Sequence, residues 1–129
     1  MIHGIGTDIV SVKRIQEGLD KYGERFASRI LAESEMAEFK QAPNPASYLA
    51  KRFAAKEAAV KALGTGFSDG ISMRHIYVTH NDAGKPLLKM TGRALTLFEK
   101  NNIGENHISI SDEREYAIAF VTLLNECRQ

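Results

Sequence analysis

The stretch SYLAKRFAAKEAAVKAL at residues 47–63 decides the fold, because it predicts the clearest helix in the chain. It is dense in Ala, Lys, Leu and Glu, which are among the strongest helix formers. Asn44 can cap this helix with Pro45 at its first position, and Gly64 supplies a stop at its C-terminal end. We therefore expect one long helix that ends before Gly64.

The segments before this helix predict a strand and two helical stretches. Residues 2–10 have the apolar content of a short buried strand interrupted by glycines, and Ser11 can cap a helix that follows. On a helical wheel, residues 12–30 separate into one apolar, one basic and one acidic face. Two glycines within this segment weaken the helix and can break it into two pieces. A second helix is expected over 33–41.

After Gly64 the hydrophobic pattern changes from a helical to an alternating period, which is typical of strands. Strands are expected near 73–80, 86–90, 107–111 and 116–124, and a helix, GRALTLFEKN, follows Thr91. The order β-α-α-α-β-β-α-β-β predicts an α+β fold with antiparallel strands packed on helices. Residues 1–129 are long enough to bury a core without disulfides or a structural metal, so we expect one small domain.

Composition argues against several classes of protein. The 17 basic and 16 acidic residues give a net charge of +1, whereas proteins that coat nucleic acid are strongly basic. No apolar run approaches the roughly 18 residues that span a bilayer, and the N-terminus resembles no export signal. Cys127 is the single cysteine and cannot form an internal disulfide. We therefore expect a cytoplasmic protein with no nucleic-acid or membrane partner.

Glu57 and Lys61 are the first candidates for chemistry, since residues four apart share one face of a helix. Such a pair is commonly a solvent-exposed ion pair with no further role. Here, however, alanines flank Glu57, and three cations lie within ten residues: Arg52, Lys56 and Lys61. One carboxylate among several cations suits an anionic ligand that is held through a metal ion.

Asp8 is the natural second carboxylate. It follows Gly4, Ile5, Gly6 and Thr7 near the end of the expected first strand, where it is either a turn-forming residue or a metal ligand. Two carboxylates together with phosphate oxygens and waters are how proteins usually hold Mg²⁺. The glycines at 64 and 66 come after a helix, so they do not form the phosphate loop that precedes a helix.

Four segments together resemble the family of holo-[acyl-carrier-protein] synthases. They are GIGTDIV at 4–10, KRFAAKEAAVKALGTG at 51–66, GKP at 84–86 and HISIS at 107–111, in the order that the family shows. The resemblance implies the α+β fold of 4'-phosphopantetheinyl transferases. It also implies an enzyme of fatty acid biosynthesis that moves 4'-phosphopantetheine from coenzyme A to a serine of apo-acyl carrier protein, with release of adenosine 3',5'-bisphosphate.

Site residues follow from the same resemblance. Asp8 and Glu57 would bind magnesium, and Lys61 would contact the phosphates of coenzyme A and help the leaving group. Four further residues match positions near the nucleotide and its phosphates: Arg52, Lys56, Gly64 and His107. Family members of this size assemble as trimers that bind coenzyme A between neighbouring subunits. Asp112 departs from the family, in which many members have a histidine. For the serine proton, Glu57 and a metal-bound water stay open as acceptors.

The resemblance also suggests a role for the basic face of residues 12–30, because acyl carrier proteins are strongly acidic. Its members are Arg14, Lys21, Arg25 and Arg29, and they would form a docking stripe for the carrier protein, unless this is simply a solvated face. Two other functions remain as alternatives. One is a metal-dependent nucleotide phosphohydrolase, which needs the carboxylates alone; the other is a non-catalytic module that binds coenzyme A or the carrier protein.

Overall fold

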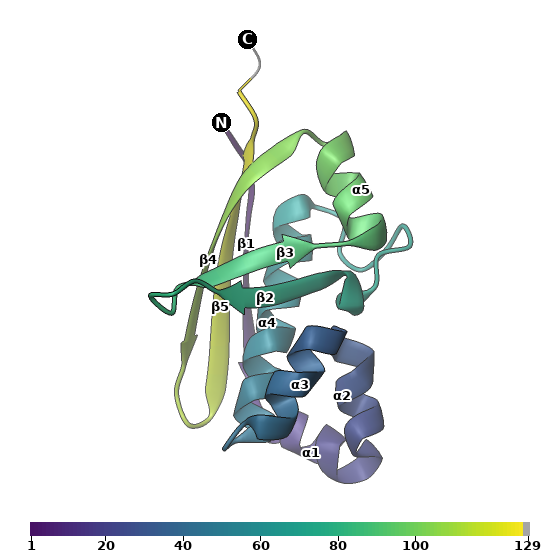
Figure 1. Ribbon diagram of the computed structural model, residues 1–129, viewed down its shortest axis with the longest axis vertical. Coiled ribbons are helices and arrows are strands. Elements are labelled where there is room, and N and C mark those ends of the chain that lie inside the picture. The colour runs from purple at the N-terminus through teal and green to yellow at the C-terminus, as the bar shows by residue number, and fades with distance from the viewer. Residues whose placement is uncertain (128–129) are drawn as a thin grey trace.

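The computed structural model describes residues 1–127 of the chain and has five helices and five strands in that part. The strands are β1 (Ile2–Ser11), β2 (Ile76–His80), β3 (Pro86–Met90), β4 (Ile103–Asp112) and β5 (Tyr116–Asn125). The helices are α1 (Val12–Tyr22), α2 (Glu24–Ile30), α3 (Glu33–Gln41), α4 (Pro45–Leu63) and α5 (Gly92–Lys100), with a short 3-10 turn at Met73–His75 (Figure 1). The α+β fold predicted from the sequence is confirmed.

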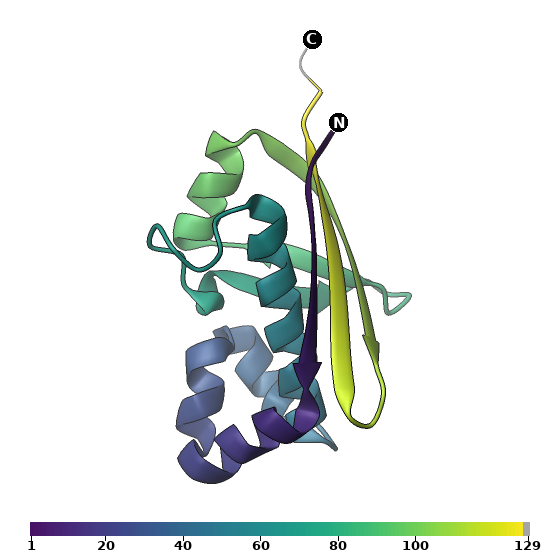
Figure 2. The ribbon, with the colours of Figure 1, turned by 180° about the vertical axis from the view of Figure 1, so that it is seen from behind.

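The strands form two antiparallel sheets. The larger has the order β1-β5-β4, and the smaller is the β2-β3 hairpin. The alanines and aliphatic residues that alternate along β5 are buried against α4: Ala117, Ala119, Val121 and Leu123. Figure 2 shows α4 running beside β1 for most of the strand's length, with α1 leaving from the end of β1. The core therefore lies between the larger sheet and α4.

Glycines in β1 bring the strand into contact with the backbone of α4. A Cβ atom at Gly6 would lie 2.0 Å from the carbonyl oxygen of Ala58, and a Cβ at Gly4 would lie 2.0 Å from that of Ala62. These separations are far inside ordinary contact, and a backbone oxygen cannot rotate away. The two elements can approach this closely only because neither strand residue has a side chain.

The helix ends follow the sequence signals closely. Asn44 caps α4 by accepting a hydrogen bond from the Ser47 amide, and Gly64 ends the helix in the left-handed conformation, with φ of 95°. The segment 12–30 is broken at Gly23, where φ is 61°, so it forms two helices. One prediction was too simple: residues 73–75 form the 3-10 turn and only 76–80 pair as a strand.

The face of the larger sheet that points away from α4 is apolar and exposed. Ile9 pairs with Ile118 in the strand register, and Thr7 pairs with Phe120, which places these side chains on the same face. Ile5, Ile9, Ile118 and Phe120 are each more than 40% exposed. None of the helices formed by residues 1–127 combines the length and the apolarity needed to cross a bilayer.

A buried ion pair ties α3 to α4. Glu35 and Lys56 are both completely buried, and the Lys56 ammonium donates to Glu35 Oε1 at 2.7 Å and to the Met73 carbonyl at 2.9 Å. The second carboxylate oxygen of Glu35 accepts from the Val78 amide of β2 at 2.9 Å. Burial lowers the pKa of Lys56, and the Glu35 charge opposes that effect. The pair thus joins two helices and the hairpin through one carboxylate.

Lys56→Met should destabilise the fold by about 3 kcal/mol or more, because it removes the nearest cation of the buried Glu35 carboxylate and leaves only Arg52 Nε, 3.9 Å from Glu35 Oε2. Lys56→Met combined with Glu35→Gln should recover much of this loss, since it removes both charges. Urea unfolding would measure both effects. Lys51→Met, the same substitution on a half-buried part of α4, is the control; equal losses in Lys51→Met and Lys56→Met would contradict the prediction.

Candidate active site

Asp8 and Glu57 line one cavity of about 420 Å³ between β1, α1, α2 and α4. Asp8 comes from β1, three residues before that strand passes into α1, and Glu57 from the middle of α4. Arg14 of α1 lines the same cavity, and Phe26 and Phe53 close its apolar side. The two carboxylates, 49 positions apart in the sequence, are therefore brought to a single site by the packing of β1 on α4.

The Lys61 side chain of α4 forms hydrogen bonds to β1. Its ammonium donates to Asp8 Oδ1 at 2.9 Å and to the Thr7 carbonyl at 3.1 Å. The side chain of Asp8 is only 16% exposed, whereas that of Lys61 is 51% exposed. Within the described residues Lys61 makes no ion pair with Glu57, so the simple helix-surface pair considered from the sequence is not formed. The cation of α4 instead neutralises the carboxylate of β1.

The negative charge of Asp8 acts on Glu57 across the cavity. The pKa of Glu57 is raised, first by burial and then by the negative charge of Asp8, while Lys61 acts in the opposite direction. Two hard oxygen donors that repel each other in a cavity suit a divalent cation. Residues 1–127 contain no cluster of three or more metal-binding side chains. The pair of Asp8 and Glu57 fits Mg²⁺, because this ion commonly takes one or two carboxylates and completes its shell with phosphate oxygens and waters.

The predicted basic stripe lies around this site, although not on one helix. A second cavity of about 350 Å³ shares Phe26 and Phe53 with the first, and Arg25 and Arg29 of α2 line it. The Lys21 ammonium lies 5.3 Å from the centre of the Tyr22 ring, beside the same surface. Because α1 and α2 bend at Gly23, cations from two helices surround an apolar groove that continues into the carboxylate cavity.

Two of the predicted coenzyme A contacts are buried in the protein. Lys56 is enclosed with Glu35, so the prediction that it contacts the nucleotide is corrected: its ammonium is already bound by a carboxylate and a carbonyl. Arg52 is only 5% exposed and its guanidinium stacks 4.6 Å from the centre of the Tyr48 ring. Arg52 Nε is buried without a hydrogen-bond partner in the described part of the chain.

His107 lies on the other side of the larger sheet from Asp8. It pairs with Thr122, which pairs with Ile5, on the exposed apolar face. Ile108 and Ile110 alternate with it and face the inner side of the sheet. One chain therefore does not bring His107 to the carboxylate cavity. Asp112, at the end of β4, accepts a hydrogen bond from Ser47 at 3.4 Å.

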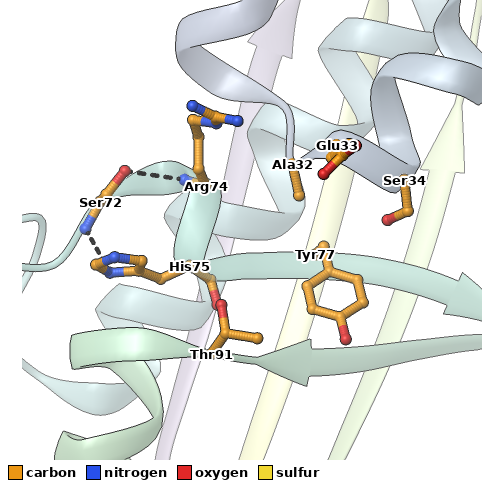
Figure 3. A pocket seen from close by; sticks show the side chains of 8 residues that line it. All are labelled: Ala32, Glu33, Ser34, Ser72, Arg74, His75, Tyr77 and Thr91. Atoms are coloured by element: carbon orange, nitrogen blue, oxygen red, sulfur yellow. Dashed lines mark hydrogen bonds between the residues drawn. The ribbon is translucent and has the colours of Figure 1, made fainter.

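A larger cavity of about 730 Å³ lies elsewhere, between the start of α3 and the β2-β3 hairpin. Figure 3 shows Glu33 and Ser34 on its helical side and Tyr77 and Thr91 on its hairpin side. Its charged residues, Glu33 and Arg74, have opposite signs, so its lining does not match the pattern of two carboxylates beside a lysine. Size alone thus does not identify the functional site.

Sequence analysis did not single out three residues that shape the site. Phe26 and Phe53 form the wall shared by the two cavities, and Glu35 anchors α4 on the side away from β1. For Glu35 a signal existed: it is the third residue of α3, where a glutamate often bonds the amide that precedes the helix, and here it accepts from the Ala32 amide at 3.0 Å. No local pattern distinguishes the two phenylalanines from ordinary core residues.

The chain is similar to known 4'-phosphopantetheinyl transferases over nearly its whole length. The family model of the 4'-phosphopantetheinyl transferase superfamily matches residues 4–121. A holo-[acyl-carrier-protein] synthase from Halorhodospira halophila is 52% identical over 124 residues, which cover 96% of this chain and 98% of that protein.

Two solved structures share the fold. The crystal structure of holo-[acyl-carrier-protein] synthase from Neisseria meningitidis aligns with a TM-score of 0.92 at 46% identity and covers 97% of this chain and 100% of its own. The enzyme from Helicobacter pylori, solved in complex with coenzyme A, aligns with a TM-score of 0.82 at 32% identity over 93% of this chain and 99% of its own. This chain belongs to the 4'-phosphopantetheinyl transferase superfamily.

Proposed function

We propose that the chain is a transferase that moves 4'-phosphopantetheine from coenzyme A to a serine hydroxyl of apo-acyl carrier protein, in support of fatty acid biosynthesis. The observation that carries this proposal is the cavity in which Asp8 and Glu57 meet, beside the Lys61 ammonium and under the arginines of α1 and α2. Family membership and the names of the relatives support the same reaction. Residues 1–129 would act as one transferase domain.

Asp8 and Glu57 are assigned as the ligands of Mg²⁺. Held by these two carboxylates, the ion would supply positive charge that offsets the pyrophosphate of coenzyme A during in-line attack. The serine oxygen forms a bond to the β-phosphorus, and the bond from that phosphorus to the bridging oxygen breaks, releasing adenosine 3',5'-bisphosphate. Lys61 stabilises the charge that develops on the leaving phosphate or donates a proton to it. Glu57 and a water are the candidate acceptors of the serine proton.

Coenzyme A is assigned to the same cavity and its surroundings. Lys61 binds Asp8, and Gly64 ends α4 three residues further on; both are proposed as contacts of coenzyme A. Arg52 remains a proposed phosphate contact, although its Nε lies 3.9 Å from Glu35 Oε2. The Lys56 ammonium is already bound to Glu35, so Lys56 is not proposed as a contact. His107 is exposed on the outer face of the sheet, so it would reach coenzyme A only across a boundary between subunits.

Self-association is part of the proposal. We assign a homotrimer in which the exposed apolar face of β1 and β5 is covered by neighbouring chains, because a row of aliphatic and aromatic side chains of this size is unfavourable in water. Such an assembly would also bring the His107 of one chain toward the carboxylate cavity of another. The location proposed for the reaction is the cytoplasm.

The carrier protein is assigned to the groove lined by Arg14, Arg25 and Arg29. Its apolar floor, Phe26 and Phe53, would receive side chains of the partner, while the cations would attract an acidic surface. A nucleotide phosphohydrolase would need the two carboxylates but not this groove. A non-catalytic binding module would need the groove but not two repelling carboxylates, so the combination favours group transfer.

Glu57→Gln should abolish transfer while it stabilises the metal-free chain. Because burial and Asp8 raise the pKa of Glu57, its ionised form is unfavourable in the folded state, and a neutral amide removes that cost. The gain in Tm should be complete at neutral pH and should disappear below the ordinary carboxyl pKa of 4.5, where the unfolded carboxyl is protonated as well. Mass spectrometry of the carrier protein, incubated with coenzyme A and Mg²⁺, measures transfer.

Glu99→Gln, on the exposed surface of α5, should change neither quantity and serves as the control. Full transfer by Glu57→Gln, or by Asp8→Ala at saturating Mg²⁺, would contradict the assignment of these carboxylates.

Reversal of charge in the docking groove should affect one substrate only. Arg25→Glu with Arg29→Glu should raise the KM for carrier protein about tenfold and leave the KM for coenzyme A nearly unchanged, because these two arginines line the second cavity and not the carboxylate cavity, and rim charges act on encounter with the acidic partner. Steady-state kinetics with each substrate varied in turn would measure this. As a control, Lys40→Glu with Lys100→Glu makes the same change of net charge at exposed positions of α3 and α5. Equal changes in the KM for carrier protein and the KM for coenzyme A would contradict the docking assignment.

Sedimentation should show a trimer that Phe120→Asp dissociates, since a carboxylate on the apolar face of β5 cannot be buried without a partner. Transfer should fall together with assembly if coenzyme A is held between subunits. Leu95→Asp is the matched control, because Leu95 of α5 is exposed to a similar degree, 40% against 44% for Phe120. A wild-type chain that sediments as a monomer at micromolar concentration and still transfers would refute the trimer.

A further inference from the structure

Gly6 occupies the point at which β1 touches the backbone of α4 nearest to the carboxylates. A Cβ atom there would lie 2.0 Å from the Ala58 carbonyl oxygen and 2.7 Å from the Ala62 amide nitrogen. Ordinary contact begins at 3.4 Å, and both obstructing atoms belong to the helix backbone. Any side chain at residue 6 must therefore push the strand and the helix apart.

Asp8 of β1 and Glu57 of α4 lie beside this contact in their own elements. Alternate residues of a strand face the same side, so Asp8 follows Gly6 on the face toward α4. Glu57 immediately precedes Ala58 in the helix. A displacement of β1 at Gly6 is consequently transmitted to the gap between Asp8 and Glu57, with little intervening chain to absorb it.

Gly4 makes the same kind of contact one helical turn away. A Cβ at Gly4 would lie 2.0 Å from the Ala62 carbonyl oxygen, as close as the obstruction at Gly6. Gly4, however, is four residues from Asp8, and Ala62 is five residues from Glu57. The two glycines thus impose the same steric demand on packing at different distances from the carboxylates.

The Lys61 side chain bridges α4 and β1 next to this contact. Its ammonium donates to the Thr7 carbonyl at 3.1 Å and to the Asp8 carboxylate at 2.9 Å. The Asp8 side chain is largely enclosed by this approach. The lower limit on the distance between the strand and the helix is nevertheless the backbone contact at Gly6, because Ala58 and Ala62 present backbone atoms there.

We infer that Gly6 is a positioning residue that sets the separation of the Asp8 and Glu57 carboxylates and thereby makes the site select a small divalent cation. This inference rests on the proposed Mg²⁺ site. Mg²⁺ requires oxygen ligands at about 2.0–2.1 Å in near-octahedral geometry, whereas Ca²⁺ accepts about 2.3–2.6 Å and irregular shells. A wider gap penalises Mg²⁺ and leaves Ca²⁺ binding much less affected.

Gly6→Ala and Gly4→Ala, compared in the full chain, test the inference. Competition of Mg²⁺ and of Ca²⁺ against Mn²⁺, followed by electron paramagnetic resonance, gives both affinities without an activity assay. In Gly6→Ala the Mg²⁺ affinity should fall about tenfold or more, as for other residues that orient metal ligands, with the Ca²⁺ affinity changed by less than about threefold. Gly4→Ala should lose similar thermal stability and keep the wild-type ratio of the two affinities.

Equal changes of that ratio in the two glycine variants, or none in Gly6→Ala, would overturn the inference. A companion variant covers the case in which Gly6→Ala does not fold. Asp8→Glu lengthens the carboxylate by one methylene at unchanged backbone separation, so the Mg²⁺ affinity should fall relative to that for Ca²⁺. An unchanged ratio in Asp8→Glu would equally count against a fixed gap.

The double variant Gly6→Ala with Asp8→Glu should regain Mg²⁺ affinity over Gly6→Ala alone, because the longer side chain spans the wider gap. Asp8→Asn separates this inference from the proposed function. If Asp8→Asn binds Mn²⁺ as tightly as the wild type, the proposed metal site itself is wrong. If Asp8→Asn loses Mn²⁺ while Gly6→Ala keeps the wild-type ratio, only the role of Gly6 is wrong.

Discussion

The backbone contact between β1 and α4 is the constraint on which the rest of the structure depends. Two glycines without side chains let a strand lie against helix carbonyls at distances that no other residue allows. Everything that meets at the carboxylate cavity comes from these two elements or from α1 and α2, which follow β1 directly in the chain. The contact thus converts two remote sequence motifs into one site.

Helix α4 divides its charged residues between two environments, and this division explains why its composition alone was misleading. Lys56 and Arg52 point to the interior, where Glu35 and Tyr48 receive them, and they stabilise the packing of α3 and the hairpin. Glu57 and Lys61 point to the cavity and to β1. Charged residues that look equivalent in a helical sequence therefore have different roles: Lys56 serves the packing, Glu57 and Lys61 serve the proposed chemistry, and Arg52 packs in the interior and is also a proposed phosphate contact.

The larger sheet likewise has two faces with different roles. Its inner face packs small residues of β5 on α4, while its outer face exposes aromatic and aliphatic side chains together with His107. A domain that buries one face of its sheet so completely has no structural need for an apolar outer face. The proposed trimer accounts for that surface and for the distance between His107 and the carboxylates with a single arrangement.

The helices and strands, their order and the α+β class could be predicted from the sequence, because caps, glycine stops and hydrophobic periods are local signals. Asn44, Gly64 and the alternation along β4 all act within a few residues. The sequence also marked Asp8, Glu57 and Lys61 as candidates. Only the tertiary structure decided that Lys61 pairs with Asp8, that Lys56 is enclosed by Glu35, and that His107 lies on the opposite face. Those outcomes depend on which faces of distant segments are pressed together, and no local pattern encodes the distance between them.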